Sequence, residues 1–406
     1  MGDMNADFFK GNREKLTEAV KGAPVVLTAY RKMQRCNDEA WRFEQEANFW
    51  YLTGVEAADW QVILEDERTT LIAPDISKIS EIFNGSLSPK EAQKISGADK
   101  VITRDEAANY LRELAKKHRE VYTVLPQNAI DHEFSLNPSQ TILTAKLRKN
   151  FSKIKDVRPF LHKLRAIKQP AEIMMLRRAI NLTRSAFEMV KAELPNYTFE
   201  YEIQARFSYE FERAGATHAY DPIVASGQNA ITLHYNSNRA GLKQGNLVLI
   251  DVGARYGGYS ADITRTYAYG EANKRQNAVH TAVKNAQNDI IKMIKPGLAI
   301  NEYLKKSDEI MHEALKSLNL LQDQVLQERS LQENLREYFP HAVSHGLGIE
   351  THDPLGNSKT FQPGMVLTVE PGIYIKKENI GVRLEDDILV TETGHENLSG
   401  QLADDL

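Results

Sequence analysis

Three apolar runs in the second half of the chain each carry an acidic residue at their end. They are 246–251, which ends in Asp251, 365–370, which ends in Glu370, and the shorter 381–385, which ends in Glu385. Apolar runs of this kind predict buried strands, and a buried carboxylate needs a compensating cation. The chain must therefore fold so that these acids meet positive charge.

The first run leads into Gly257 and Gly258, a pair that tight hairpins favour. With these glycines as the two turn residues, Asp251 faces Thr264, two residues from Asp262. Because side chains alternate along a strand, the two aspartates share one face as diagonal neighbours, roughly 7–8 Å apart at Cα. An alternative interpretation is a pair of solvated acids on an exposed face.

We also expect Arg383 and Glu385 to lie on the same face of the strand at 381–385. At ~4 Å and an effective dielectric constant of ~20, two like charges repel by about 4 kcal/mol. Four converging carboxylates would therefore either protonate or bind metal. Oxygen-rich ligation with one imidazole suits Mn²⁺, with Zn²⁺ and Co²⁺ as alternatives.

Three histidines occur within twelve residues in a chain that has only eleven: His341, His345 and His352. Pro340, directly before this segment, and the two glycines within it favour a strand or loop over a helix. A lone histidine is more often structural, but this grouping favours a site. His234 follows a turn at 226–227, and it either belongs to the same pocket or packs as a structural residue.

The composition excludes several classes of protein. The 406 residues predict two domains, and 42% apolar with 26% charged residues is ordinary for a soluble globular protein. A net charge of −4 gives no footprint for nucleic acid or anionic membrane. The single cysteine, Cys36, cannot form an internal disulfide, and we see neither a secretory signal nor an apolar span of ~20 residues. We therefore expect a soluble, cytoplasmic protein without nucleic-acid or membrane partners.

We expect the chain as a whole to be α+β. It divides at about Ile167 into an N-terminal α/β domain, 1–167, and a domain of mixed helices and strands, 168–406. In the first domain we expect strands at 25–27, 62–64, 70–73 and 121–125 and a helix over 106–120. In the second, Pro170 is placed to begin a helix, and Thr198 to cap the next, which ends near Gly215. Further helices are expected over 273–294 and 301–336, and strands over 247–252, 260–267, 365–370 and 382–390.

The ordered set of Asp251, Asp262, His345, Glu370 and Glu385 resembles the five metal ligands of the pita-bread (creatinase/aminopeptidase) fold. The surrounding sequences are specific: Leu-Ile-Asp-Val-Gly, Ala-Asp-Ile-Thr-Arg-Thr, Ser-His-Gly-Leu-Gly, Leu-Thr-Val-Glu-Pro-Gly-Ile-Tyr and Arg-Leu-Glu-Asp-Asp. The first domain resembles the aminopeptidase P N-domain through 35–38 and 43–54. Together these segments resemble the Xaa-Pro aminopeptidase (aminopeptidase P) family, with prolidase as a near relative.

This resemblance implies two divalent metal ions and a homo-oligomer, either a dimer or a tetramer. Asp262 and Glu385 would bridge the ions, Asp251 would complete one, and His345 with Glu370 would complete the other. A hydroxide between the metals would attack the peptide bond between an N-terminal residue and a following proline.

The resemblance also implies roles around the metals. Glu370 would relay the proton. His234, His341 and His352 would orient the substrate and stabilise the oxyanion, and Arg383 would organise the groups around the ligands.

Three alternatives remain. The first is a prolidase, in which the segment corresponding to 354–361 would be longer and would carry an arginine for the dipeptide carboxylate. In this chain only Lys359 lies near that position. A non-catalytic peptide-binding protein and a metal-free creatinase-type hydrolase share the fold. Both of these last two would leave four carboxylates uncompensated, so the complete ligand set favours the peptidase.

Overall fold

The computed structural model describes residues 4–127, 134–321 and 331–406. The chain forms two compact units, Met1–Leu164 and Arg165–Leu406. The division falls beside the boundary that the sequence suggests at Ile167. None of the helices in the described ranges combines the length and the apolar character needed to cross a bilayer.

The first unit is built on a mixed sheet with the strand order β6-β5-β4-β1-β7-β8. Its strands are β1 (Val25–Thr28), β4 (Gln61–Glu65), β5 (Arg68–Ile72), β6 (Lys100–Ile102), β7 (Glu120–Thr123) and β8 (Lys153–Asp156), and a short ribbon joins β2 (Gln34–Cys36) to β3 (Glu39–Ala40). Its helices are α1 (Ala6–Ala19), α2 (Ala47–Thr53), α3 (Lys78–Asn84), α4 (Pro89–Ser96), α5 (Arg104–Lys117) and α6 (Ser139–Leu147), and α7 (Arg158–Ala166) leads into the second unit. The expected strands are confirmed.

Helices α5 and α6 pack on the sheet of the first unit through a cluster that includes Val26, Ile63 and Leu111. The helix expected over 106–120 is confirmed as α5, but it begins at Arg104. Thr103 fixes this start, because its hydroxyl accepts from the backbone N–H of Glu106 while the Glu106 carboxylate accepts from the N–H of Thr103. The sequence therefore carries its helix-start signal, Thr103, three residues before the expected first residue at 106.

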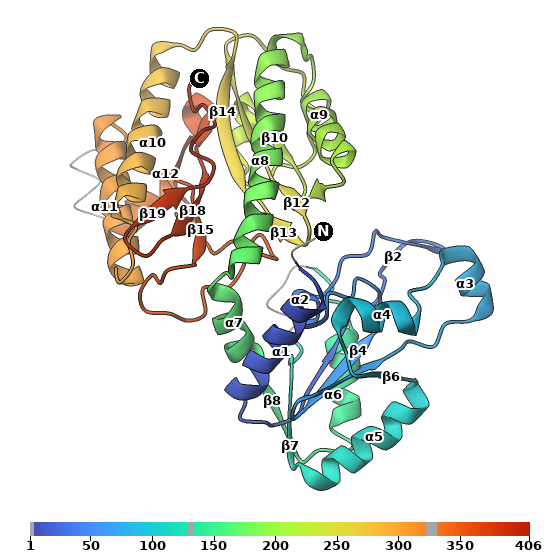
Figure 1. Cartoon of the computed structure of the whole chain (residues 1–406). Helices are drawn as coiled ribbons and strands as arrows, with labels where there is room; N and C mark the ends of the chain where they lie inside the picture. Colours follow the sequence, from blue (N-terminus) through green and yellow to red (C-terminus); the bar gives the residue numbers. More distant parts are fainter. Residues whose placement is uncertain (1–3, 128–133, 322–330) are drawn as a thin grey trace. The chain divides into compact units, whose positions relative to one another are not determined.

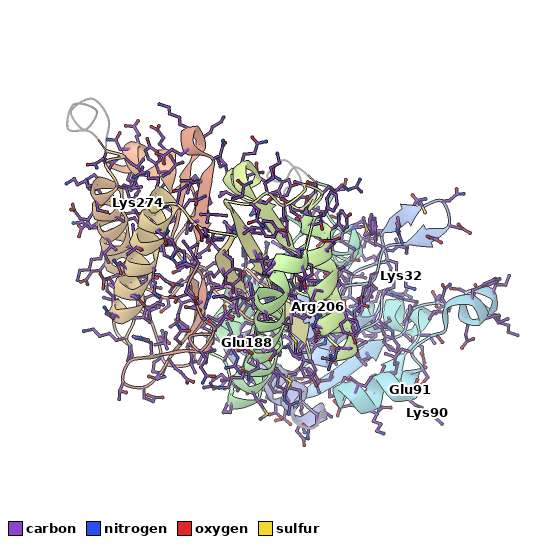
Figure 2. All side chains as sticks on the ribbon, turned by 90° about the horizontal axis from the view of Figure 1, so that it is seen from above. Lys32, Lys90, Glu91, Glu188, Arg206 and Lys274 are labelled. Atoms are coloured by element: carbon purple, nitrogen blue, oxygen red, sulfur yellow. The ribbon has the colours of Figure 1, made fainter. Side chains whose placement is uncertain are left out.

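The second unit contains five α-helices in the described part of the chain: α8 (Pro170–Glu193), α9 (Glu200–Arg213), α10 (Lys274–Met293), α11 (Ile300–Ser317) and α12 (Leu331–Tyr338). Pro170 begins α8, as predicted. Arg206 of α9, labelled in Figure 2, pairs with Glu193 at the end of α8 at 2.7 Å. This ion pair joins the two helices at one end.

Two helix predictions are wrong. The helix expected over 301–336 ends at Ser317, and Asn319 adopts a φ of 57° that a right-handed helix cannot contain; residues 322–330 of that prediction lie outside the described residues. Thr198 does not cap α9, which begins at Glu200 after Phe199. The Glu202 carboxylate accepts from the backbone N–H of Thr198 and of Phe199 instead.

The strands of the second unit form three-stranded and two-stranded sheets. The three-stranded sheets are β10 (Ile223–Ser226), β11 (Asn246–Val252) and β14 (Ile263–Tyr269); β9 (Thr217–His218), β12 (Ala254–Tyr256) and β13 (Tyr259–Ser260); and β15 (Val366–Val369), β18 (Asp386–Val390) and β19 (His395–Asn397). The remaining pair is β16 (Gly372–Ile375) with β17 (Ile380–Arg383). In Figure 1, α10, α11 and α12 lie on one side of these strands and α8 and α9 on the other.

Two predicted strands are each divided in the structure. The strand expected over 260–267 is β13 followed by β14, in different sheets. The strand expected over 382–390 breaks at Leu384 and Glu385, because β17 pairs with β16 whereas β18 pairs with β15. The break places Glu385 in the short connection between β17 and β18, which belong to different sheets.

Candidate metal centre

Asp251 and Asp262 are held by the hairpin whose register the sequence predicts. Asp251 on β11 pairs with Thr264 on β14. Gly257 and Gly258 form the turn with φ values of 57° and 87°, which suit a two-residue hairpin loop. Both aspartates are buried, at 8% and 5% exposure. The alternative of two solvated acids on an exposed face is therefore wrong.

Tyr220 connects the two aspartates, and sequence reasoning missed it. Its hydroxyl lies within hydrogen-bond distance of Asp251 Oδ1 and, at 2.6 Å, of Asp262 Oδ1. One hydroxyl proton serves one acceptor at a time. The second short contact therefore requires either a proton on a carboxyl group or a cation nearby. No motif in the sequence marks Tyr220, which lies in the short connection between β9 and β10.

Arg383 supplies positive charge to Asp251 and is only 4% exposed. It donates to Asp251 Oδ2, to Thr264 Oγ1 at 3.1 Å and to the Tyr374 hydroxyl at 2.8 Å. Thr264 in turn donates to Glu385 Oε2 at 2.7 Å. Arg383 and Glu385 thus approach the same threonine although the expected strand is interrupted between them.

His345 faces the carboxylates with its Nε2 atom, which lies 3.4 Å from Asp262 Oδ2 and 3.5 Å from Glu370 Oε1. Its Nδ1 atom lies 3.0 Å from the carbonyl oxygen of Gly346. A proton donated from Nδ1 to this carbonyl leaves the Nε2 lone pair directed at the carboxylates, as in a metal-ligating histidine. Asp262, His345 and Glu385 each place one ligand atom within 4.8 Å of the others.

The electrostatics of this cluster fit a divalent cation. Burial raises the pKa of Asp251 above its ordinary value, although Arg383 opposes this shift. Burial, with the neighbouring Asp262, raises the pKa of Glu385 well above its ordinary value, and burial raises that of Glu370 to about 7. Burial lowers the pKa of His345, but its hydrogen bond to Asp262 and the nearby charges outweigh burial and raise it to about 9, so in the metal-free protein Nε2 also carries a proton, which a bound metal ion would displace. Carboxyl groups whose pKa is raised in this way need positive charge nearby in order to ionise near neutral pH, and divalent ions would provide it.

The three other candidate histidines surround this centre. His341 Nε2 lies 2.9 Å from the Tyr374 hydroxyl, and its Nδ1 lies 3.4 Å from Glu370 Oε2. The His352 ring stands 4.2 Å from the His345 ring, centroid to centroid. Burial lowers the pKa of His341 to about 3 and that of His352 below its ordinary value, so both rings stay neutral. His234 lies in a turn and is exposed.

These residues line one cavity of about 550 Å³ in the second unit. Its lining includes every predicted site residue: His234, Asp251, Asp262, His341, His345, His352, Glu370, Arg383 and Glu385. Lys359 is not part of this lining. It is exposed, and its backbone carbonyl accepts from the N–H of Ile300. Lys359, the one basic residue near the position of the prolidase arginine, is thus not among the residues that line this cavity.

Comparison with known proteins shows matches over nearly the whole chain. Metallopeptidase family M24 matches residues 174–392, and the Aminopeptidase P N-terminal domain matches residues 9–122. The Xaa-Pro aminopeptidase of Escherichia coli (strain K12) is 31% identical over 99% of this chain and 96% of its own length. Xaa-Pro aminopeptidase 3 of Homo sapiens is 31% identical over 91% of this chain and 76% of its own length.

Solved structures agree with the sequence matches. Aminopeptidase P from E. coli with the inhibitor Pro-Leu has a TM-score of 0.87 at 30% identity, covering 99% of this chain and 97% of that one. A Zn-substituted form of the E. coli enzyme in complex with product has a TM-score of 0.88 at 29% identity, with the same coverage of both chains. The two matched domains, their order and the near-complete coverage of both chains lead to one conclusion: the chain belongs to the aminopeptidase P family of M24 metallopeptidases.

Proposed function

We propose that the chain is a metal-dependent exopeptidase that hydrolyses the bond between an N-terminal residue and a following proline in Xaa-Pro-Yaa peptides. The observation that carries this proposal is the convergence of Asp262, His345 and Glu385 on one point of a buried, carboxylate-rich cavity. The relatives named Xaa-Pro aminopeptidase, which match almost the full length of the chain, support the substrate class.

The proposed ligands for two divalent ions are Asp251, Asp262, His345, Glu370 and Glu385. Mn²⁺ is the proposed metal, because oxygen ligands dominate the set, with Zn²⁺ and Co²⁺ as alternatives. When bound, the ions activate a water molecule and polarise the scissile carbonyl.

Side chains around the ligands would orient the substrate and move the proton. Glu370, whose carboxylate lies beside the other proposed ligands, would accept the proton of the attacking water and return it to the leaving amine. The neutral ring of His352 can donate a hydrogen bond to a developing oxyanion without carrying charge. The ring nitrogens of His341 already contact the Ala342 carbonyl at 2.8 Å and the Tyr374 hydroxyl at 2.9 Å, so His341 would orient the substrate. Arg383 holds Asp251 and Tyr374 in place, and Tyr374 in turn contacts His341.

The selection of proline follows from its shape. Proline has a fixed φ and no backbone N–H, so a binding site recognises it by a compact ring and not by an amide donor. The cavity offers such a surface, since Ala219, Ile223 and Leu233 line it beside the carboxylates.

The test is hydrolysis of Xaa-Pro-Yaa tripeptides, matched Xaa-Ala-Yaa tripeptides and Xaa-Pro dipeptides by metal-depleted protein before and after Mn²⁺ is restored. We expect release of the first residue from Xaa-Pro-Yaa only with metal, slower cleavage of Xaa-Pro and little cleavage of Xaa-Ala-Yaa. Good cleavage of Xaa-Pro with none of the tripeptide would replace this proposal with a prolidase. Absence of all cleavage with Mn²⁺, Zn²⁺ and Co²⁺ would end it.

The proposed assembly is a homo-oligomer, a dimer or a tetramer, acting in the cytoplasm. Helix α3 supports self-association, because none of its residues is buried and Ile79, Ile82 and Phe83 are 69%, 81% and 81% exposed. Apolar side chains grouped in this way favour an interface. A reducing compartment suits the exposed thiol of Cys36. Light scattering of the purified protein tests the assembly, and a monomer would contradict it.

A further inference from the structure

Glu200, the first residue of α9, is fully buried although it carries a carboxylate. Its Oε1 accepts from the backbone N–H of Ser226 at 2.8 Å, from the Ser226 hydroxyl at 2.7 Å and from Asn229 Nδ2 at 3.0 Å. Its Oε2 accepts from the Tyr235 hydroxyl and from the backbone N–H of Ala240, both at 2.9 Å. All five donors are neutral groups on one segment, 226–240.

This segment carries His234. Three of the donors come before the histidine in the chain, and the other two come after it. A single buried side chain therefore fastens both ends of the His234 loop. Because a buried carboxylate is tolerated only when its hydrogen bonds are made, the segment is held as tightly as Glu200 itself.

The residues next to His234 explain why it faces the cavity. Leu233 and Tyr235 pack against an apolar cluster that contains Ile223, Leu249 and Tyr374. His234 lies between them, is itself exposed and lines the cavity of the metal centre. Tightening the Tyr235 end of the loop thus fixes the direction in which the neighbouring imidazole points.

We propose that Glu200 is a positioning residue that holds His234 in place beside the candidate metal site. The inference rests on the proposed peptidase function, in which His234 stabilises the transition state. Glu200 does not line the cavity, so it acts only through the loop. Its replacement should lower turnover because the imidazole is misplaced, without removing metal.

Glu200→Gln preserves the shape and removes one acceptor, since the amide nitrogen donates and cannot accept. We expect kcat for an Xaa-Pro-Yaa peptide to fall by about 10- to 100-fold, with KM nearly unchanged and the metal content intact. The matched control is Glu172→Gln. Glu172 is also a buried glutamate in the first turn of a helix, but it accepts from Tyr259 and Gln169 and not from the His234 loop. This variant should lose thermal stability and keep kcat.

A double-mutant cycle separates positioning from a general structural effect. In a His234→Ala background, Glu200→Gln should change kcat by less than about twofold, because the residue through which it acts is gone. An equal loss of kcat in both backgrounds would overturn the proposal. If Glu200→Gln does not fold, Tyr235→Phe removes one donor to Glu200 and enters the same cycle with the same expected result.

Hydrogen exchange of the segment 226–240 gives a readout that does not depend on activity. Faster exchange there in Glu200→Gln, but not in Glu172→Gln, supports the anchoring, and unchanged exchange refutes it. Wild-type protein that cleaves no Xaa-Pro peptide would refute the proposed function, while the exchange comparison would still decide whether Glu200 orders the loop.

Discussion

Replacing Arg383 with methionine tests whether the buried carboxylates depend on positive charge. Arg383→Met roughly preserves the length of the side chain and removes its charge. It leaves Asp251 as a buried carboxylate without its cation, and it takes a donor from Tyr374 and Thr264. Removing one partner of a buried ion pair costs about 3–5 kcal/mol. We therefore expect a loss of about that size in the metal-free protein near neutral pH.

The assay is urea unfolding of metal-free wild type and variant, followed by circular dichroism. Tryptophan fluorescence is unsuitable, because the three tryptophans all lie in the first unit. The control is Arg275→Met. Arg275 pairs with Glu378 at 2.7 Å, but both side chains are about one-third exposed, at 33% and 34%. A surface pair of this kind is worth about 0–1 kcal/mol.

The loss caused by Arg383→Met should depend on pH with a definite sign. Burial raises the pKa of Asp251, and Arg383 opposes the shift, so the variant raises this pKa further. The cost of an ionised Asp251 is present above the pKa in the folded variant, and it disappears as the pH falls and the carboxyl group protonates. The difference between variant and wild type should therefore shrink at pH 5, and saturating Mn²⁺ should also reduce it. A loss below about 1 kcal/mol near neutral pH, or one that is unchanged at pH 5, would refute this reasoning.

Three further predictions concern the same centre. Asp262→Asn should remove activity and most of the bound metal together, and metal analysis that finds two full equivalents would contradict a bridging role. His234→Ala should retain both metals and a near-normal melting temperature while kcat falls by about 10²–10³-fold. Loss of metal would show that His234 is a metal ligand, and full activity would show that it has no part in catalysis. In metal-free protein, burial raises the pKa of Glu370 from 4.5 to about 7, so the folded state binds more protons between these values. Its stability should therefore fall as the pH rises through this window, and melting curves at several pH values with and without Mn²⁺ should show the trend only without metal.

The sequence could predict the hairpin because its information is local. Two consecutive glycines with positive φ fix a two-residue turn, and a fixed turn fixes the register of every residue on either side. The pairing of Asp251 with Thr264 follows from that turn alone. In the same way, the acidic ends of the apolar runs and the segment of three histidines identify residues that line the cavity from the sequence pattern alone.

The sequence could not predict features that depend on which segments meet. The strand expected over 382–390 breaks because its two halves pair with different partners, β16 and β15, and no local signal shows this. Tyr220 and Tyr374 bind the same charged network as the predicted residues, but a tyrosine in a loop or strand has no pattern that marks it. Glu200 looks from sequence like an ordinary acidic residue at a helix start, which would be solvated.

The sequence by itself determined the chemistry of the site, because the number and order of carboxylates and histidines in apolar surroundings require a cation wherever they converge. Only the tertiary structure decided how that chemistry is held. The hydroxyl of Tyr220 lies between two aspartates, Arg383 spans Asp251, Thr264 and Tyr374, and Glu200 fastens the loop of His234. These contacts join residues far apart in the chain. They depend on long-range packing and burial, which raise the cost of an unpaired charge and so select the partners that a local pattern cannot specify.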